Sequence, residues 1–291
     1  MIKFIKNLLN IDNDCVYEIN NILINNPNSK LGFELPNRSI IKVTILNINY
    51  NIYYEISGKE FLKVLNNLII KSEITLLLIF VNVYHKEISD FIKKNKIENI
   101  SLENFIFSDL VKLQLNNIKN LSIKLGFTNN NLFDIMKYIN QMQYLEYFYC
   151  VYRSTHLKEI IQILKYNKQI KNLHLINIDS IINIDIYEEV YKKEYQELFL
   201  NNNALVSFKS NCGLISNETY NEIFNILKYN KTLQSYTSLN ENWIFDIKSL
   251  NNLKIYNDTL NTIIINKQKF TNDNNLIKLN FNYFDINFIY L

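Results

Sequence analysis

The residues best suited to chemistry lie in the middle of the chain, where Cys150, His156 and His174 follow one another within a short stretch. A thiol beside an imidazole can act as a nucleophile and its base, and a thiol with two imidazoles can hold part of a metal site. Their spacing matches neither a catalytic nor a zinc-binding motif. We predict a structural thiol at Cys150, with no catalytic residue, metal or cofactor.

The known catalytic motifs are absent from the sequence. It contains no Walker-type phosphate loop, no glycine-rich dinucleotide fingerprint, no H-E-x-x-H and no G-x-S-x-G. With only 4 glycines, a loop whose backbone cradles a phosphate is not expected. The sequence therefore predicts a protein that is not an enzyme.

Composition sets further limits on class and partner. The 291 residues are 48% hydrophobic, enough for a continuous core in one or two domains. Asn and Ile each supply about fifty residues, and the enriched types share A/T-rich codons, so an Asn run is weak support for function. A net charge of +3, with lysines scattered along the chain, lacks the clustered basic surface of a nucleic-acid-binding protein. We predict no nucleic-acid partner.

The expected compartment follows from the cysteines and the apolar runs. Cys15, Cys150 and Cys212 form an odd set without disulfide or metal spacing, as expected for free thiols in a reducing compartment. Residues 1–10 lack the apolar core of a secretion signal, and the longest apolar run, 74–83, is about half the length of a membrane span. These features predict a cytoplasmic protein without membrane contact.

The chain repeats itself. Residues 159–168, EIIQILKYNK, return as residues 222–231, EIFNILKYNK, and a fainter copy lies about 28 residues before each. Self-similarity at this period indicates a solenoid of stacked units, which binds partners through an extended surface.

Each unit reads as one helix and one strand. Apolar residues within 157–164 recur at spacings of three and four, as in an amphipathic helix. A segment with period-two alternation follows, as in a half-buried strand. Units are expected to begin at Ile40, Ile74, Ile97, Ile118, Met142, Ile170, Leu205, Leu233 and Leu260. An all-helical HEAT or armadillo array, the competing fold, would show two long amphipathic blocks per unit.

This pattern resembles the leucine-rich repeat family, whose unit reads LxxLxLxxN or LxxLxLxxC before a helix, and the spacing resembles the ribonuclease-inhibitor-like class. Asn82 and Cys150 match the polar residue that closes the motif, whereas Ser210 and Ser238 are polar where an inward apolar residue belongs. The resemblance implies an α/β horseshoe, with short parallel strands on the concave side and helices on the convex side. It implies one continuous solenoid, with an N-terminal cap at 1–39, repeats at 40–269, and an irregular last repeat or C-terminal cap at 270–291.

Residues facing away from the core on the concave side form the candidate binding site. We take them as the second, fourth and sixth positions after the first apolar residue of a unit. The candidate partner-binding residues are Tyr144, Glu146, Phe148, Asn172, His174 and Lys209. Aromatic side chains around a carboxylate have the composition of an interface hot spot. The alternative is that a chain with 13% aromatic residues places them on this face by accident.

We therefore expect a monomeric, non-enzymatic scaffold that binds a protein partner on its concave face. The resemblance implies two alternatives. One is a GTPase-activating protein for a small GTPase, with Arg38 or Arg153 as its catalytic arginine. The other is a substrate adaptor of a ubiquitin ligase, although residues 1–39 lack an F-box pattern. The Asn runs at 129–131 and 201–203 are expected to be solvated loops.

Overall fold

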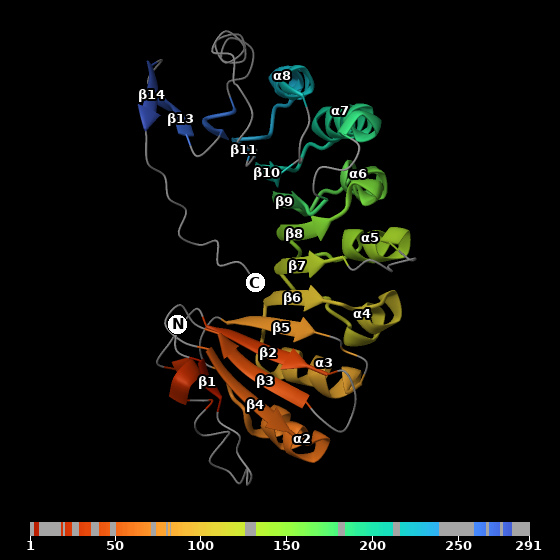
Figure 1. The fold of residues 1–291 in the computed structure, drawn as a ribbon, viewed down its shortest axis with the longest axis vertical. Helices are drawn as coiled ribbons and strands as arrows, with labels where there is room; N and C mark the ends of the chain where they lie inside the picture. Colours follow the sequence, from red (N-terminus) through yellow and green to blue (C-terminus); the bar gives the residue numbers. More distant parts are fainter. Residues whose placement is uncertain are drawn as a thin grey trace. The chain divides into compact units, whose positions relative to one another are not determined.

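The computed structural model has an α/β fold, in which short strands alternate with helices over most of the chain (Figure 1). The residues that it describes are 3–5, 19, 21–24, 29–35, 41–46, 51–70, 74–79, 81, 83–125, 132–179, 184–211, 216–238, 259–265, 268–273 and 276–280. The chain divides into two compact units, Met1–Leu145 and Glu146–Leu291. Among the described helices, none has the length and apolar character needed to cross a membrane.

The first unit contains a mixed sheet. Its strands are β1 (Lys3–Ile5), β2 (Lys30–Glu34), β3 (Ile41–Leu46), β4 (Asn51–Ile56), β5 (Thr75–Ile79), β6 (Asn99–Glu103) and β7 (Asn120–Lys124). They lie in the order β1-β4-β3-β2-β5-β6-β7. The β2–β3 and β3–β4 pairs are antiparallel, and the other pairs are parallel. The predicted repeat beginning at Ile40 is therefore wrong, since β3 belongs to an antiparallel meander; the alternation of parallel strand and helix begins at β5.

Four helices of this unit pack side by side in chain order. They are α2 (Gly58–Asn67), α3 (His85–Lys94), α4 (Phe107–Leu113) and α5 (Leu132–Asn140). The start of α2 shows how the sequence sets such a boundary. Ser57 Oγ accepts a hydrogen bond from the Glu60 amide at 3.3 Å, and the Glu60 carboxylate accepts one from the Ser57 amide at 2.7 Å. This reciprocal capping satisfies two amide groups that a helix start leaves without a partner.

The second unit is more regular. Its parallel strands are β8 (Tyr147–Tyr152), β9 (Asn172–Asn177), β10 (Ser207–Asn211), β11 (Ser235–Ser238) and β12 (Thr262–Ile265). Its helices are η1 (Ser154–His156), α6 (Leu157–Leu164), α7 (Ile184–Asn201), α8 (Asn217–Ile226) and η2 (Leu227–Tyr229). Two antiparallel strands, β13 (Gln268–Asp273) and β14 (Leu276–Asn280), follow β12. Of the predicted last segment, 270–291, residues 274–275 and 281–291 lie outside the described residues.

A recurring backbone contact joins successive parallel strands and shows that the fold is repeat-like. Just before each strand, one carbonyl accepts hydrogen bonds from two consecutive amides of the next repeat. The carbonyl of Lys171 accepts from Val206 at 2.8 Å and Ser207 at 2.9 Å. The acceptors at the same position in other repeats are the carbonyls of Glu98, Glu146, Val206 and Gln234.

The predicted frame of the repeat at β8 is wrong by three residues. Phe148 pairs in register with Leu173, and its side chain is fully buried. The first apolar residue of that repeat is therefore the buried Leu145, three residues before Phe148, rather than Met142. Phe148 contributes to the core and not to a binding face.

Cys150 is likewise an inward-facing strand residue. It pairs in register with Leu175 and is fully buried, so its assignment to the position that closes the motif is wrong. Asn82, the other residue assigned there, lies outside the described residues. Ser210 and Ser238 do occupy inward strand positions as predicted, and each is 1% exposed.

Three buried asparagines stand one per repeat in the second unit, and we call Asn167, Asn202 and Asn230 the asparagine ladder. Each precedes the first apolar residue of its repeat by three positions and is 3–4% exposed. Asn202 Oδ1 accepts hydrogen bonds from the amides of Ala204 and Leu205, both at 2.9 Å. The prediction of a solvated loop at 201–203 is therefore wrong for Asn202.

The side-chain amide nitrogens of Asn202 and Asn230 reach back to the preceding repeat. Asn202 Nδ2 donates to the carbonyls of Leu164 at 2.8 Å and Asn167 at 3.2 Å. Asn230 Nδ2 donates to the carbonyls of Phe199 at 2.8 Å and Asn202 at 3.2 Å. The turns at Asn202 and Asn230 are thus each bonded to the turn before.

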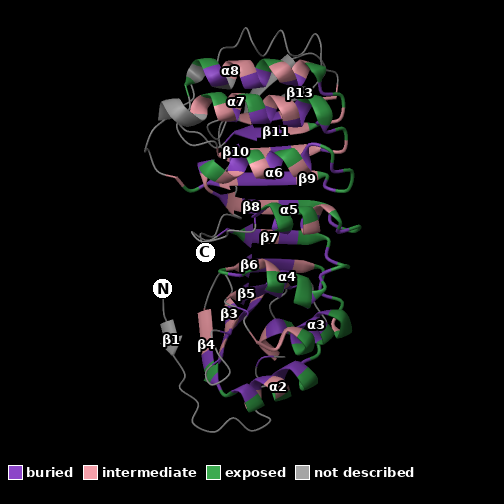
Figure 2. Cartoon of the chain, turned by 90° about the vertical axis from the view of Figure 1, so that its right-hand side faces the viewer, coloured by how far each residue is buried: buried purple, intermediate pink, exposed green. Residues whose placement is uncertain are grey.

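An aromatic cluster fills the core between the helices and strands of the second unit. The ring of Phe208, in β10, lies 5.0 Å from Phe199, 5.5 Å from Tyr195 and 6.0 Å from Tyr236, measured between centroids. All four side chains are at most 2% exposed. Figure 2 shows how burial is distributed: residues of the strands are mostly buried, and exposed residues lie on the outer sides of the helices.

Candidate functional site

The candidate surface is the side of the second unit's sheet that the helices α6–α8 leave uncovered (Figure 1). We call it the helix-free face. Strand register places its residues in three rows: Tyr147, Asn172 and Ser207; Tyr149, His174 and Lys209; and Val151, Ile176 and Asn211. Tyr147 is 37% exposed. Aromatic, cationic and amide side chains thus occur on adjacent strands of one surface.

The structure brings together half of the predicted binding residues. Strand register places Asn172, His174 and Lys209 at positions of the helix-free face, but His174 is buried there. Tyr144 is 57% exposed but precedes β8, and Glu146 also precedes it. The frame shift explains what the sequence analysis missed, since the aromatic residues that face outward from β8 are Tyr147 and Tyr149.

Glu146 forms an ion pair with Lys171 of the next repeat, with 3.2 Å between Oε1 and Nζ. Both side chains are 53% exposed. Pairs with this exposure contribute little to stability, because water screens the two charges. Lys119 and Glu98 occupy the same repeat positions in the first unit and form a pair at 2.8 Å. The pairing therefore belongs to the repeat and does not single out a site.

His174 lies in the middle row of the helix-free face but is only 2% exposed. The ring of Tyr149 packs against it edge-on at 4.6 Å between centroids. Burial lowers the pKa of His174 to about 3, and the charge of Lys209 acts in the same direction. The imidazole is therefore neutral at physiological pH and, being buried, packs beneath the surface rather than offering a contact to a partner.

The thiol and the two imidazoles are not arranged for chemistry. Cys150 faces the core, whereas His174 pairs with Tyr149 and faces the opposite side of the sheet. Burial raises the pKa of the Cys150 thiol, so the reactive thiolate is suppressed. His156 lies in η1, where burial lowers its pKa. Within the described ranges, no three His, Cys, Asp or Glu side chains are grouped so that they could hold a metal ion.

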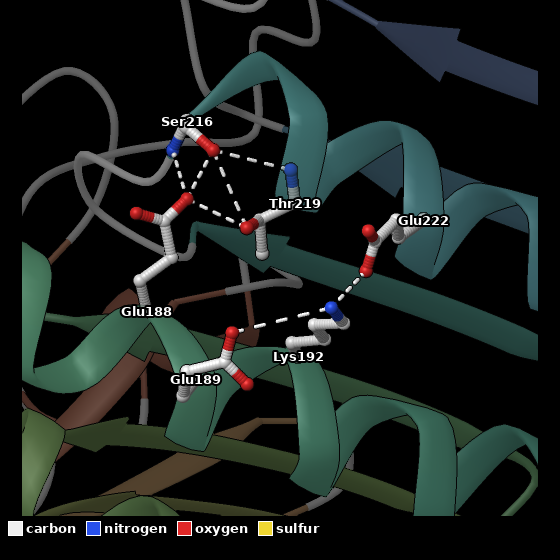
Figure 3. A network of polar contacts seen from close by, with 6 residues as sticks. All are labelled: Glu188, Glu189, Lys192, Ser216, Thr219 and Glu222. Carbon is white, nitrogen blue, oxygen red and sulfur yellow. Dashed lines mark hydrogen bonds and ion pairs between the residues drawn. The ribbon is translucent and has the colours of Figure 1, made fainter.

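A second polar cluster joins α7 to the start of α8 (Figure 3). Glu188 Oε1 accepts hydrogen bonds from the Ser216 amide at 3.0 Å and from the Thr219 hydroxyl at 2.6 Å, and it also contacts the Ser216 hydroxyl. Ser216 is the N-cap of α8, and its own Oγ accepts from the Thr219 amide at 3.2 Å. Beside this cluster, Lys192 pairs with Glu189 and Glu222. The arrangement is a helix cap supplied by the neighbouring repeat.

Replacing Glu188 by glutamine should destabilise the protein in a pH-dependent way. Hydrogen bonds from Ser216 and Thr219 hold the pKa of Glu188 below its ordinary value. The cap therefore stabilises the fold fully above the unfolded-state pKa of about 4.3, and this contribution is lost as pH falls through the lower folded-state pKa. We expect the Tm of the variant to be roughly 2 °C lower at pH 7, with the difference shrinking below pH 4 in thermal scans.

Glu189→Gln is the matched control, since the Glu189 side chain is 81% exposed and lies 4.0 Å from Lys192. Its Tm should stay within about 1 °C of the parent across the same range. A Glu188→Gln difference that did not change with pH would contradict the assigned cap.

No protein-family model matches the chain. A stretch of 194 residues is 29% identical to the phenylalanine–tRNA ligase beta subunit of Mycoplasma mycoides subsp. mycoides SC, and it covers 63% of this chain. The match spans only 24% of the ligase subunit, so the chain corresponds to about a quarter of that protein's length.

Proposed function

We propose that the chain is a non-enzymatic scaffold of the leucine-rich-repeat type, which binds a protein partner through the helix-free face. The observation that carries the proposal is the row structure of β8–β10, which holds Tyr147, Tyr149 and Lys209 at outward positions on a regular parallel sheet. Tyrosine side chains have few rotatable bonds, so those held on a rigid backbone lose little conformational entropy on binding. Lys209 adds a charge beside them. A repeat protein uses such a surface for extended contact with a partner.

The alternatives have less support. A GTPase-activating arginine has to extend into the partner's nucleotide site, whereas Arg153 directly follows β8 and is half-buried. Arg38 lies outside the described residues. A ligase adaptor would need an F-box in residues 1–39, where the structure describes strands β1 and β2 and the helical residues 19 and 21–24.

Site-specific photo-crosslinking tests this surface. A photoreactive amino acid placed at position 147 or 209 should capture the same partner band from native extract. The matched control is position 158, an exposed residue of α6. We expect a band that appears from both face positions, is absent from position 158, and is lost by competition with unlabelled protein. Equal labelling from all three positions would show that the partner does not bind specifically to the helix-free face.

The captured partner, once purified, should bind the Tyr147→Ser/Tyr149→Ser variant at least tenfold more weakly than the parent chain. Loss of two hot-spot tyrosines amounts to about 2 kcal/mol or more. Phe133→Ser, which changes a 54% exposed residue of α5, should leave binding unchanged. Unaltered affinity of the double variant, with near-ultraviolet circular dichroism showing an intact fold, would refute the proposal.

A further inference from the structure

A second surface of the second unit consists of the turns between its helices and strands. The repeated segment Lys-Tyr-Asn-Lys occurs there twice, at 165–168 where α6 ends and at 228–231 where η2 ends. In both copies the asparagine belongs to the buried ladder and the tyrosine is exposed. Tyr166 is 64% exposed and Tyr229 is 60% exposed. We call the two segments together the KYNK edge.

The asparagine ladder holds these turns rigidly. Asn167 Oδ1 accepts hydrogen bonds from the amides of Gln169 at 2.9 Å and Ile170 at 2.7 Å. Asn230 makes the equivalent bonds with Thr232 at 3.0 Å and Leu233 at 2.7 Å. Because both asparagines make the same pair of bonds to the backbone that follows them, the tyrosine before each stands at the equivalent position of its turn.

The ladder also fixes the spacing of the two tyrosines. The turn at Asn202 bonds directly to the turn at Asn167, and the turn at Asn230 bonds to that at Asn202. One repeat therefore separates Tyr166 from Tyr229. With neighbouring strands about 4.8 Å apart, the two turns are on the order of 10 Å apart. Leu200, 55% exposed, adds apolar surface from the repeat between them.

Four lysines lie along the KYNK edge, and one of them, Lys165, is balanced by a carboxylate. Lys165 Nζ lies 5.2 Å from the centre of the Tyr166 ring, and Lys228 Nζ lies 4.8 Å from that of Tyr229. Lys168 and Lys231 are exposed. Lys165 also pairs with the Glu197 carboxylate at 3.0 Å. These lysines lie on two turns that the asparagine ladder joins through the turn at Asn202.

We infer that the KYNK edge binds a single-stranded nucleic acid, whose bases stack on Tyr166 and Tyr229 while its phosphates lie near the flanking lysines. Exposed aromatic rings spaced along a basic surface are the features that bind single strands without sequence preference. An acidic peptide would satisfy the lysines but would leave the flat rings without a stacking partner. This surface is separate from the helix-free face, so the two proposals stand or fall independently.

Fluorescence anisotropy of the full chain with a labelled 20-nucleotide oligothymidine tests the inference. We expect saturable binding at 50 mM salt that the Tyr166→Ser/Tyr229→Ser variant weakens at least fivefold. With two or three phosphates neutralised by Lys168, Lys228 and Lys231, the logarithm of the binding constant should fall with the logarithm of salt at a slope of about −1.5 to −2. Lys168→Glu/Lys231→Glu should weaken binding and make the slope shallower.

Two control variants establish that binding depends on the KYNK edge. Phe133→Ser and Tyr147→Ser/Tyr149→Ser should bind the oligonucleotide as the parent chain does, and circular dichroism should show that all variants fold. Absence of binding, or binding that the two tyrosine substitutions leave unchanged, overturns the inference. Equal competition by polyglutamate or by duplex DNA of the same length also overturns it, because neither presents unpaired bases for stacking.

Discussion

Replacing Asn202 by alanine should lower the free energy of unfolding by about 3 kcal/mol. The substitution removes a buried side chain that makes four hydrogen bonds, two accepted and two donated. It leaves the carbonyls of Leu164 and Asn167 and the amides of Ala204 and Leu205 without that partner. Buried backbone groups in this condition carry a desolvation penalty. Chemical denaturation followed by circular dichroism measures the loss.

The sequence supplies its own controls, because Asn202 lies between two other asparagines. Asn201 and Asn203 are exposed, so Asn201→Ala and Asn203→Ala should each change the stability by less than about 0.5 kcal/mol. Equal effects at all three positions would show that the ladder is not what stabilises the turn.

Replacing Phe208 by alanine should cost about 3–5 kcal/mol, the range for removing a large buried aromatic side chain. Phe208 is 1% exposed and packs against Tyr195, Phe199 and Tyr236. Its neighbours come from a helix and from the adjacent strand, so their backbones cannot move far to fill the cavity. Denaturant titration should show a lower midpoint, or no cooperative transition at 37 °C.

Phe133→Ala is the comparison for this variant, since Phe133 is 54% exposed in α5. Its cost should stay below about 1 kcal/mol. Phe208→Leu, which keeps most of the apolar volume, should recover part of the loss. A Phe208→Ala protein as stable as the parent would mean that the aromatic cluster does not form the core of the second unit.

The alternation of helix and strand could be predicted from the sequence because it depends on periodicity. The spacing of apolar residues predicted a helix over 157–164, and α6 spans Leu157–Leu164. Alternation alone does not encode strand direction, however. Residues 41–56 alternate as well as any repeat, yet β3 and β4 pair in antiparallel fashion.

The frame at β8 could not be settled from the sequence, because tyrosine suits either side of a sheet. Met142, Leu145 and Tyr147 fit the repeat pattern as well as Leu145, Phe148 and Cys150 do. Leu145 belongs to both sets. The second set is the one that faces the core throughout, because Phe148 and Cys150 are fully buried whereas Tyr147 is exposed. Taking Met142 instead of Leu145 as the first residue of the repeat placed Phe148 on the predicted binding face. It also left Tyr147 and Tyr149 out of that face.

The asparagine ladder was hidden by composition. In a chain with about fifty asparagines, three at equivalent positions carry little statistical weight. They differ from the exposed asparagines beside them in being buried and in hydrogen bonding that links neighbouring repeats. The amino-acid sequence alone shows neither property.

The ladder also has a consequence for how the second unit opens. In stacked repeats, cooperativity depends on the energy of the interface between neighbours relative to the energy of each repeat. Side-chain amides that cross from one turn to the next add to that interface energy, so fraying of one turn removes bonds from its neighbour. The amides of Ala204, Leu205, Thr232 and Leu233, all bonded to ladder asparagines, should therefore exchange with solvent deuterium together, as one cooperative segment.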